Sequence, residues 1–336
     1  MENREQLETV LSDMETQRKN TKPIGTYGIK FLDDYLSGIL PNDFIMIGAE
    51  SGVGKSELAY ELAFRNSERL RVHLFALECD MYEPYNRMKY KIVAREFFKD
   101  SERNYQEMNL RNYQLNLIDV DKYIPIAEKE ILDKYSKLHI HYREHQFAIG
   151  DLIRKMGEIK DECDMIVLDH IDYFDLDSSG SEVLQMTEIM KQLRSINLIY
   201  QIPVVFVSHL RKKSNRKQLI PDEDDYIGSS SKVKQSKTVI TLAKDKDDEN
   251  YADGIYGTLC HIAKGGRISP KSNLVGKIWF NIKTGCYGDK YELYRIKNYG
   301  ETLEQLSNPT LFPKWAEGAT KPEPEEKYKE LFGEKQ

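Results

Sequence analysis

The sequence predicts an α/β fold in which a mainly parallel central sheet is flanked by helices. Short apolar runs, typical of buried strands, alternate along the chain with segments of helical periodicity. The run at residues 44–48 leads through a loop of small residues into a helical segment that starts at Lys55. Since parallel strands are joined by crossover helices, this alternation predicts helices on both faces of the sheet.

The length and composition agree with this class. A chain of 336 residues that is 40% hydrophobic can form one large domain or two small ones. No run of about 20 apolar residues and no secretory signal is present, so we expect a cytoplasmic protein without a membrane span. The four cysteines form no CxxC pair, which argues against a zinc site. Because the net charge is −6, nucleic-acid binding would need a local basic surface.

The chain divides into three predicted parts. Residues 1–21 hold a short N-terminal linker helix whose apolar side chains form one stripe. An isolated helix of this length is marginal in water, so we expect it to dock on its own domain or on a neighbouring subunit. Residues 22–290 form the α/β domain. Residues 291–336 combine charges with prolines, which predicts a solvated, partly disordered C-terminal tail.

Within the domain, apolar runs predict five main strands and three shorter ones. The main strands are expected at residues 44–48, 72–77, 138–142, 165–169 and 204–208, and the shorter ones at 239–242, 259–263 and 277–282. Helices are expected at residues 55–66, 149–160 and 183–200. A long polar section after residue 78 also reads as mainly helical, up to about residue 137.

The loop after the first strand is predicted to bind nucleotide phosphates. It consists of Ala49, Glu50, Ser51, Gly52, Val53, Gly54, Lys55 and Ser56, and it follows the P-loop pattern G-x-x-x-x-G-K-S/T with alanine in the first position. Small residues let backbone N–H groups approach the phosphates, and the helix N-terminus adds positive potential. We expect Lys55 to reach the β- and γ-phosphates and the Ser56 hydroxyl to bind Mg²⁺.

Three polar residues end predicted strands near this loop. Asp169 can hold Mg²⁺ through its water shell opposite Ser56, although many buried strands end in aspartate. Glu78 can orient and activate the attacking water, or it is an ordinary surface glutamate at a strand end. His209 can sense the γ-phosphate by a hydrogen bond, or it is an ordinary polar strand-end residue.

With these residues placed, the sequence resembles the ATPase domain of DnaB-type replicative helicases, the superfamily 4 hexameric motors with a RecA-like fold. The entry pattern of that family is matched by Thr26, Gly28, Leu32, Asp33, Gly38 and Asp43. Its P-loop often begins with alanine, like Ala49, and its second strand ends like Ala76-Leu77-Glu78. The resemblance extends from about residue 22 to about residue 290 and is thin between 80 and 135.

The resemblance implies ATP and Mg²⁺ as ligands, with Glu78 as the catalytic glutamate and Asp169 as the metal-binding aspartate. His209 corresponds to the histidine of related phage primase-helicases. It further implies a homo-hexamer or other homo-oligomer in the cytoplasm of a bacterium or of a phage host. Primase and a helicase loader are possible partners of such a ring. The helix at residues 3–18 resembles the linker helix that packs on the adjacent subunit.

The family also has a late Lys-x-Arg pair that reaches into the neighbouring subunit's site. Here the sequence is Lys264-Gly-Gly-Arg267, so the spacing is one residue longer. Arg267 fits best as the arginine finger that stabilises charge on the transferred phosphoryl group. Lys264 is then the weaker match, as a second nucleotide contact. The alternative for both residues is an ordinary solvated or ion-paired loop.

The densest basic run follows the His209 strand. It contains Arg211, Lys212, Lys213, Arg216 and Lys217, and the small residues Gly228, Ser229 and Ser230 come next. Basic side chains and exposed backbone N–H groups suit phosphate contacts that ignore base identity. A charge run alone is typical of a solvated loop, but the corresponding family loops grip single-stranded DNA. Because aromatic residues are absent from this run, backbone tracking is favoured over base stacking.

Two main functions remain open from the sequence. The first is an ATP-dependent DNA helicase or translocase, a ring that hydrolyses ATP at subunit interfaces and moves on single-stranded DNA. The alternative is a RecA-like DNA-binding ATPase that acts as a filament, loader or switch without unwinding, since one fold serves many functions. A small-molecule kinase is a third and weaker interpretation, because the sequence offers no pocket for a phosphate acceptor.

Overall fold

The computed structural model describes residues 2–306 except 101–107, 144–146, 177–180, 211–217, 222–224, 226–229, 246–253 and 266–272. Its helices are α1 (Glu2–Asn20), α2 (Lys30–Leu36), α3 (Lys55–Ser67), α4 (Tyr82–Phe98), α5 (Leu110–Gln114), α6 (Ile124–Lys134), α7 (Ile149–Ile159), α8 (Glu182–Tyr200) and α9 (Ser230–Gln235). Its strands are β1 (Phe44–Ala49), β2 (Val72–Ala76), β3 (Leu138–Tyr142), β4 (Met165–Asp169), β5 (Val204–His209), β6 (Thr238–Lys244), β7 (Ile255–Gly265), β8 (Leu274–Asn281), β9 (Cys286–Lys297) and β10 (Thr302–Gln305). Among these described helices, none is long and apolar enough to cross a membrane.

The strands form one sheet with the order β10-β9-β8-β7-β6-β1-β5-β4-β2-β3. The strands from β6 to β3 pair in parallel, which confirms the predicted α/β architecture with a mainly parallel central sheet. Beyond β6 the sheet continues as an antiparallel meander of β7, β8, β9 and β10. Antiparallel neighbours need only short turns, and residues 282–285 form such a turn between β8 and β9.

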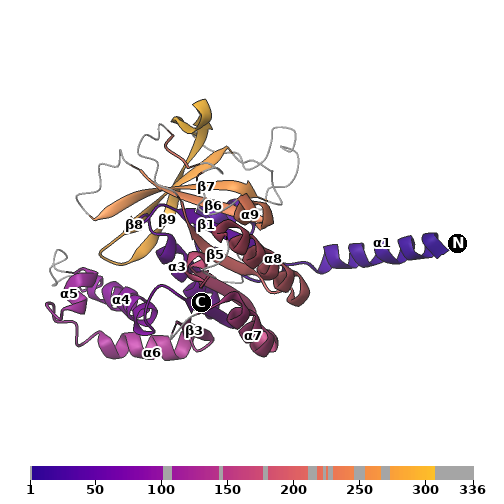
Figure 1. Ribbon diagram of the computed structural model, residues 1–336. Helices are drawn as coiled ribbons and strands as arrows, with labels where there is room; N and C mark the ends of the chain where they lie inside the picture. Colours follow the sequence, from indigo (N-terminus) through magenta and orange to yellow (C-terminus); the bar gives the residue numbers. More distant parts are fainter. Residues whose placement is uncertain are drawn as a thin grey trace.

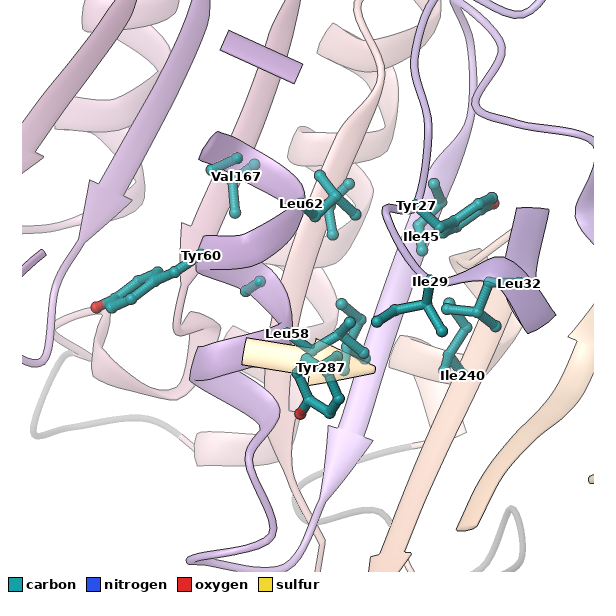
Figure 2. Packing of buried hydrophobic residues seen from close by; sticks show 14 of the residues in the cluster. Tyr27, Ile29, Leu32, Ile45, Leu58, Tyr60, Leu62, Val167, Ile240 and Tyr287 are labelled. Carbon is teal, nitrogen blue, oxygen red and sulfur yellow. The ribbon is translucent and has the colours of Figure 1, made fainter. Parts of the chain in front are cut away.

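Helices cover both faces of the parallel part of the sheet (Figure 1). Successive residues of β1 point to opposite faces, so Ile45 and Ile47 belong to one buried cluster and Phe44 and Met46 to another. Figure 2 shows the first cluster, to which Leu58 and Leu62 of α3 belong together with Ile45 and Ile240. The second cluster contains Leu193 of α8. Since both faces are buried, β1 can be apolar without interruption.

The segment that enters the domain is held by Asp33. Its carboxylate accepts hydrogen bonds from the Thr26 hydroxyl at 2.6 Å and from the Tyr27 backbone N–H at 2.8 Å. Gly28 follows Tyr27 directly and adopts the left-handed region, with φ of 71°. The Thr26, Gly28 and Asp33 pattern noted in the sequence is therefore a structural turn that fixes the start of the domain.

The long polar section between β2 and β3 forms α4, α5 and α6, with a buried cluster of its own. Helix α4 also supports α3, the helix that follows the phosphate loop. The Arg87 guanidinium pairs with Glu57, and Lys91 Nζ lies 2.9 Å from Glu61 Oε2. These ion pairs hold the first turns of α3 against α4.

Helix α1 projects away from the domain (Figure 1). Its apolar stripe of Leu7, Val10, Leu11 and Met14 is 54–61% exposed. The alternative that this stripe docks on its own domain is therefore wrong. Docking on a neighbouring subunit stays a prediction, and the exposed stripe leaves an apolar surface for it.

The sheet extends past residue 290, where we expected the C-terminal tail to begin. That predicted boundary lies inside β9, and β10 continues the sheet to Gln305. The expectation was wrong because β9 alternates buried residues such as Tyr287 and Leu293 with charged ones, so no continuous apolar run marks it. Residues 307–336, the rest of the predicted tail, lie outside the described residues.

Candidate nucleotide site

The phosphate loop connects β1 to α3 at the carboxyl edge of the parallel sheet. Ala49 ends β1, and Lys55 is the first residue of α3. Gly52 and Gly54 have φ angles of 75° and 104°, a region that glycine adopts without strain. At Gly54 a Cβ atom would also lie 2.9 Å from the Tyr287 hydroxyl oxygen. Both geometry and space therefore require glycine directly before Lys55.

Tyr287 of β9 supports this loop from the antiparallel part of the sheet. Its hydroxyl donates a hydrogen bond of 3.1 Å to the Gly54 carbonyl, and its ring is buried. Tyr287 and Leu58 of α3 belong to the same buried cluster (Figure 2). The sequence prediction missed Tyr287 because it placed no strand after residue 282.

A cavity of about 700 Å³ opens beside the loop, a volume within the usual range of ligand sites. The predicted residues among its lining are Ser51, Gly52, Val53, Gly54, Lys55, Ser56, Glu78 and Asp169. Tyr256 and Phe280 line it as well and supply aromatic surface. Glu50 lies in the same loop, one residue after β1. The structure thus brings the predicted phosphate, metal and water-activating residues into one cavity.

Lys55 is 6% exposed within this cavity. Burial lowers the pKa of its ammonium group, and the nearby carboxylates of Glu78, Asp169 and Asp172 oppose that shift. The positive side chain therefore lies among acidic groups, and a phosphate would supply a further negative partner for it.

Ser56 and Asp169 meet where the first turn of α3 faces the carboxyl end of β4. The Ser56 hydroxyl donates a hydrogen bond of 3.0 Å to Asp169 Oδ1. Asp169 is 1% exposed, and burial raises the pKa of its carboxyl group to about 6. A hydroxyl and a carboxylate supply only oxygen atoms, the ligands that Mg²⁺ prefers. This pair therefore fits the predicted magnesium position.

Glu78 follows β2 and lies beside two residues that the sequence prediction missed. Its Oε2 lies 3.2 Å from His170 Nε2, and its Oε1 accepts a hydrogen bond of 3.3 Å from the Tyr173 hydroxyl. His170 is fully buried, and burial lowers its pKa to about 3, so the imidazole is neutral. Both residues follow Asp169 in the stretch Asp169-His-Ile-Asp-Tyr173, where only the first aspartate was considered.

His209 lies beside this group. It ends β5, pairs in register with Ala49, and packs its ring edge-on against His170 at a centroid distance of 4.2 Å. Burial lowers the pKa of His209. Its backbone N–H donates to Asp172 Oδ2 at 2.8 Å. Asp172 was also missed, and so was Lys232 of α9, whose ammonium pairs with Asp172 Oδ1.

Lys264 contacts helix α9. Its ammonium donates to the carbonyl oxygens of Val233, Lys234 and Ser236 at 3.1, 3.4 and 2.6 Å. A cation at the end of a helix stabilises carbonyls that have no partner within the helix. Lys264 was already the weaker match to a nucleotide contact, because its spacing from Arg267 is one residue longer than in the family pattern. A structural role is consistent with that.

Most residues of the predicted finger and DNA contacts lie outside the described residues. They are Arg267, Arg211, Lys212, Lys213, Arg216, Lys217, Gly228 and Ser229. Ser230 is the first residue of α9. The assignments of Arg267 and of the DNA contacts therefore stay predictions.

Comparisons with known proteins agree with this geometry. The chain is similar to a solved structure described as an ATPase domain, with 18% identity and a TM-score of 0.66 over 85% of this chain and 98% of that one. It is also similar to a DnaB-like replicative helicase solved for its interactions with primase, with 17% identity and a TM-score of 0.58 over 90% of this chain and 66% of that one. These likenesses confirm the RecA-like fold. No curated protein matches the chain.

A family model supplies the sequence relationship. The model described as the DnaB-like helicase C terminal domain matches residues 26–267. That range holds the phosphate loop, Glu78, Asp169 and His209, together with the entry turn at Asp33. Because the match extends over more than half of the chain, the protein belongs to the DnaB-like helicase C-terminal domain family.

Proposed function

We propose that the protein is an ATP-dependent DNA helicase or translocase that forms a ring and hydrolyses ATP at its subunit interfaces. One observation supports the ATPase part above all others. Lys55, Ser56, Glu78 and Asp169 come from three separate parts of the fold and line one cavity of about 700 Å³. These are the residue types that phosphoryl transfer needs for phosphate binding, metal binding and water activation.

In this proposal each side chain has a separate task. Backbone N–H groups of the loop and the Lys55 ammonium bind the β- and γ-phosphates. Ser56 and Asp169 hold Mg²⁺, which neutralises phosphate charge when it is bound there. Phe280 supplies an aromatic face in the same cavity on which the base can stack. His209 senses the γ-phosphate from the neighbouring strand end.

Glu78 orients the attacking water and accepts its proton. The Tyr173 hydroxyl donates a hydrogen bond of 3.3 Å to this carboxylate, and the uncharged His170 imidazole lies 3.2 Å from it. Since both neighbours are uncharged, Glu78 forms no ion pair with either of them. This arrangement favours Glu78 as the general base.

The proposal extends to assembly and DNA. Arg267 of one subunit completes the site of the next, and the exposed stripe of α1 packs on a neighbouring subunit, most simply in a homo-hexamer. The basic run at 211–217 and the small residues at 228–230 contact the backbone of single-stranded DNA. A DnaB-like relative was solved for its interactions with primase, so primase and a loader are the proposed partners.

The test measures ATP turnover, assembly and strand separation in that order. The Lys55→Ala variant is expected to lose turnover, whereas Lys30→Ala, the same change at a surface ion pair of α2, is expected to retain it. Native mass measurement with ATP and single-stranded DNA is expected to give a closed ring that opens a forked duplex. Turnover with DNA binding but without duplex opening would favour a filament, loader or switch. If Lys55→Ala turns over ATP normally, the site assignment is wrong.

A further inference from the structure

Lys232 of α9 is a lysine in the interior of the protein, with 1% of its surface exposed. Its ammonium pairs with Asp172 Oδ1 and lies 3.1 Å from the Ser208 hydroxyl. Lysine is almost never fully buried unless it is paired, and a buried pair is costly when one partner is removed. The position of α9 therefore depends on Asp172.

Asp172 also connects to the phosphate end of the nucleotide site. Its second oxygen, Oδ2, accepts the His209 backbone N–H at 2.8 Å and lies 3.7 Å from His170 Nδ1. On its other side, His170 Nε2 lies 3.2 Å from Glu78. A continuous chain of polar groups thus leads from Lys232 through Asp172 and His170 to the proposed general base.

The imidazole of His170 allows two alternative hydrogen bonds within this series of polar groups. A neutral imidazole has one N–H, so it can donate to Glu78 or to Asp172 but not to both. In the present arrangement, neither ring nitrogen has a hydrogen bond of regular geometry to any described residue, although both are buried. Each ring nitrogen is therefore available for a hydrogen bond to the carboxylate next to it.

Helix α9 joins this chain to other parts of the molecule. It begins at Ser230, the last of the small residues predicted to contact DNA, and it packs against α8. Its Val233 and Lys234 carbonyls accept hydrogen bonds from Lys264, three residues before Arg267 in the sequence. A movement of α9 therefore changes the position of Ser230 and of the carbonyls that hold Lys264.

We propose that Asp172 and Lys232 are a positioning pair that couples nucleotide binding to the position of α9, and through α9 to single-stranded DNA. A γ-phosphate adds negative charge beside Lys55 and His209, which changes the field at Asp172 in a low-dielectric interior. The strength of the Asp172–Lys232 pair therefore differs between the ATP-bound and nucleotide-free states. By linkage, DNA must change nucleotide affinity by the same factor. The inference rests on the proposed function, because it requires a chain that binds both ATP and DNA.

The experiment measures the affinity of the full chain for a non-hydrolysable ATP analogue, with and without a single-stranded oligonucleotide. The ratio of the two affinities is the coupling factor. The variants are Lys232→Met, Asp172→Asn, the double variant with both changes, and the charge-conserving Lys232→Arg. Lys234→Met is the matched control, because Lys234 lies on the same helix and is exposed. Thermal unfolding of every variant reports the structural effect separately.

For the wild type we expect a coupling factor of roughly 5- to 150-fold, the usual range between coupled sites. Both single neutral variants are expected to lower the melting temperature and to bring the factor close to one. The double variant is expected to regain much of the melting temperature, since it leaves no unpaired charge, but not the coupling. Lys232→Arg and Lys234→Met are expected to keep the factor.

Two outcomes would overturn the inference. If the double variant regains the coupling together with its stability, the pair is only structural. If the single variants fold and keep the wild-type factor, α9 is not linked to the site through this pair. A wild-type chain that binds the analogue but no DNA would instead contradict the proposed function, so the two failures are distinguishable.

Discussion

The hydroxyl of Tyr287 donates a hydrogen bond of 3.1 Å to the Gly54 carbonyl, and the two residues are 233 positions apart in the sequence. Tyr287 is buried, and its ring packs against Phe280 at a centroid distance of 5.0 Å. Gly54 directly precedes Lys55, the residue proposed to reach the phosphates. The antiparallel part of the sheet therefore fixes the shape of a loop that belongs to the parallel part.

The Tyr287→Phe variant tests this support. It removes the hydrogen bond but keeps the ring, so we expect a loss of about 1 kcal/mol in the free energy of unfolding. Since the loop is then less well fixed, the KM for ATP is expected to rise more than kcat falls. Isothermal titration with an ATP analogue measures the change in affinity directly.

Tyr291→Phe on the same strand is the matched control. The Tyr291 hydroxyl donates a hydrogen bond of 2.7 Å to Asp34, and Tyr291 is not among the described residues that line the cavity. We expect a similar loss of stability with unchanged nucleotide affinity. Equal affinity losses in both variants would show that Tyr287 acts only through global stability.

His170 is expected to affect kcat more than ATP binding. In His170→Phe the Glu78 carboxylate loses its imidazole neighbour at 3.2 Å, while the phosphate loop is unchanged. We expect kcat to fall by about 10- to 100-fold, which is part of the usual contribution of a general base. His170→Gln, whose amide can still donate to Glu78, is expected to retain more turnover. Stopped-flow hydrolysis and analogue binding separate the two effects, and a pure loss of binding would contradict the role.

The histidines at the β2–β3 edge predict a loss of stability in acid. His73 Nδ1 lies 2.9 Å from His141 Nε2, and burial lowers the pKa of both side chains to about 4. Their pKa in the unfolded chain is about 6.5. The folded state therefore prefers the neutral forms, so their contribution is complete above about pH 6.5 and is lost as the pH falls toward 4.

Thermal melting between pH 7.5 and pH 5 measures this effect. The double variant His73→Phe with His141→Phe is expected to lose less melting temperature on acidification than the wild type. His139→Phe is expected to weaken the pH dependence only in part, because His139 stacks on His73 at a centroid distance of 4.6 Å and helps to lower its pKa. Parallel curves for the wild type and the double variant would refute the assignment.

The stripe on α1 predicts an effect on assembly alone. Leu7 and Leu11 are 61% and 56% exposed, so Leu7→Asp with Leu11→Asp removes no contact with the domain core. We expect an unchanged melting temperature of the domain but a smaller assembly in sedimentation or native mass measurements. Gln6→Asp, an exposed polar position of the same helix, is expected to leave assembly intact. An unaltered distribution of oligomers in the double variant would exclude α1 from the interface.

The parts of the site that could be predicted from the sequence depend on local patterns. The phosphate loop, its strand and its helix are contiguous, so their order along the chain and their secondary structure could be predicted from residues 44–67 alone. Glu78 and Asp169 could be placed because the carboxyl ends of parallel strands meet at one edge of the sheet. The structure confirms that both line the same cavity as Lys55.

The parts that could not be predicted depend on contacts distant in sequence. Lys232 reads as one more cation in a basic, polar stretch, and only the packing of α9 shows that it is buried against Asp172. Tyr287 lies in a strand whose alternating charges hide its buried face. The placement of α1 was left open by the sequence because an apolar stripe does not specify what covers it.

The late position of β9 in the sequence also has a consequence for biosynthesis. A chain that emerges from the ribosome exposes β1, α3 and the phosphate loop long before Tyr287 of β9 has been translated. Domains fold as units, and the earlier part of a chain must wait for its later partners. We therefore expect a nascent chain that ends before residue 287 to bind ATP poorly even though it contains the whole P-loop. Tight nucleotide binding is therefore expected only after the last strands of the domain have been synthesised.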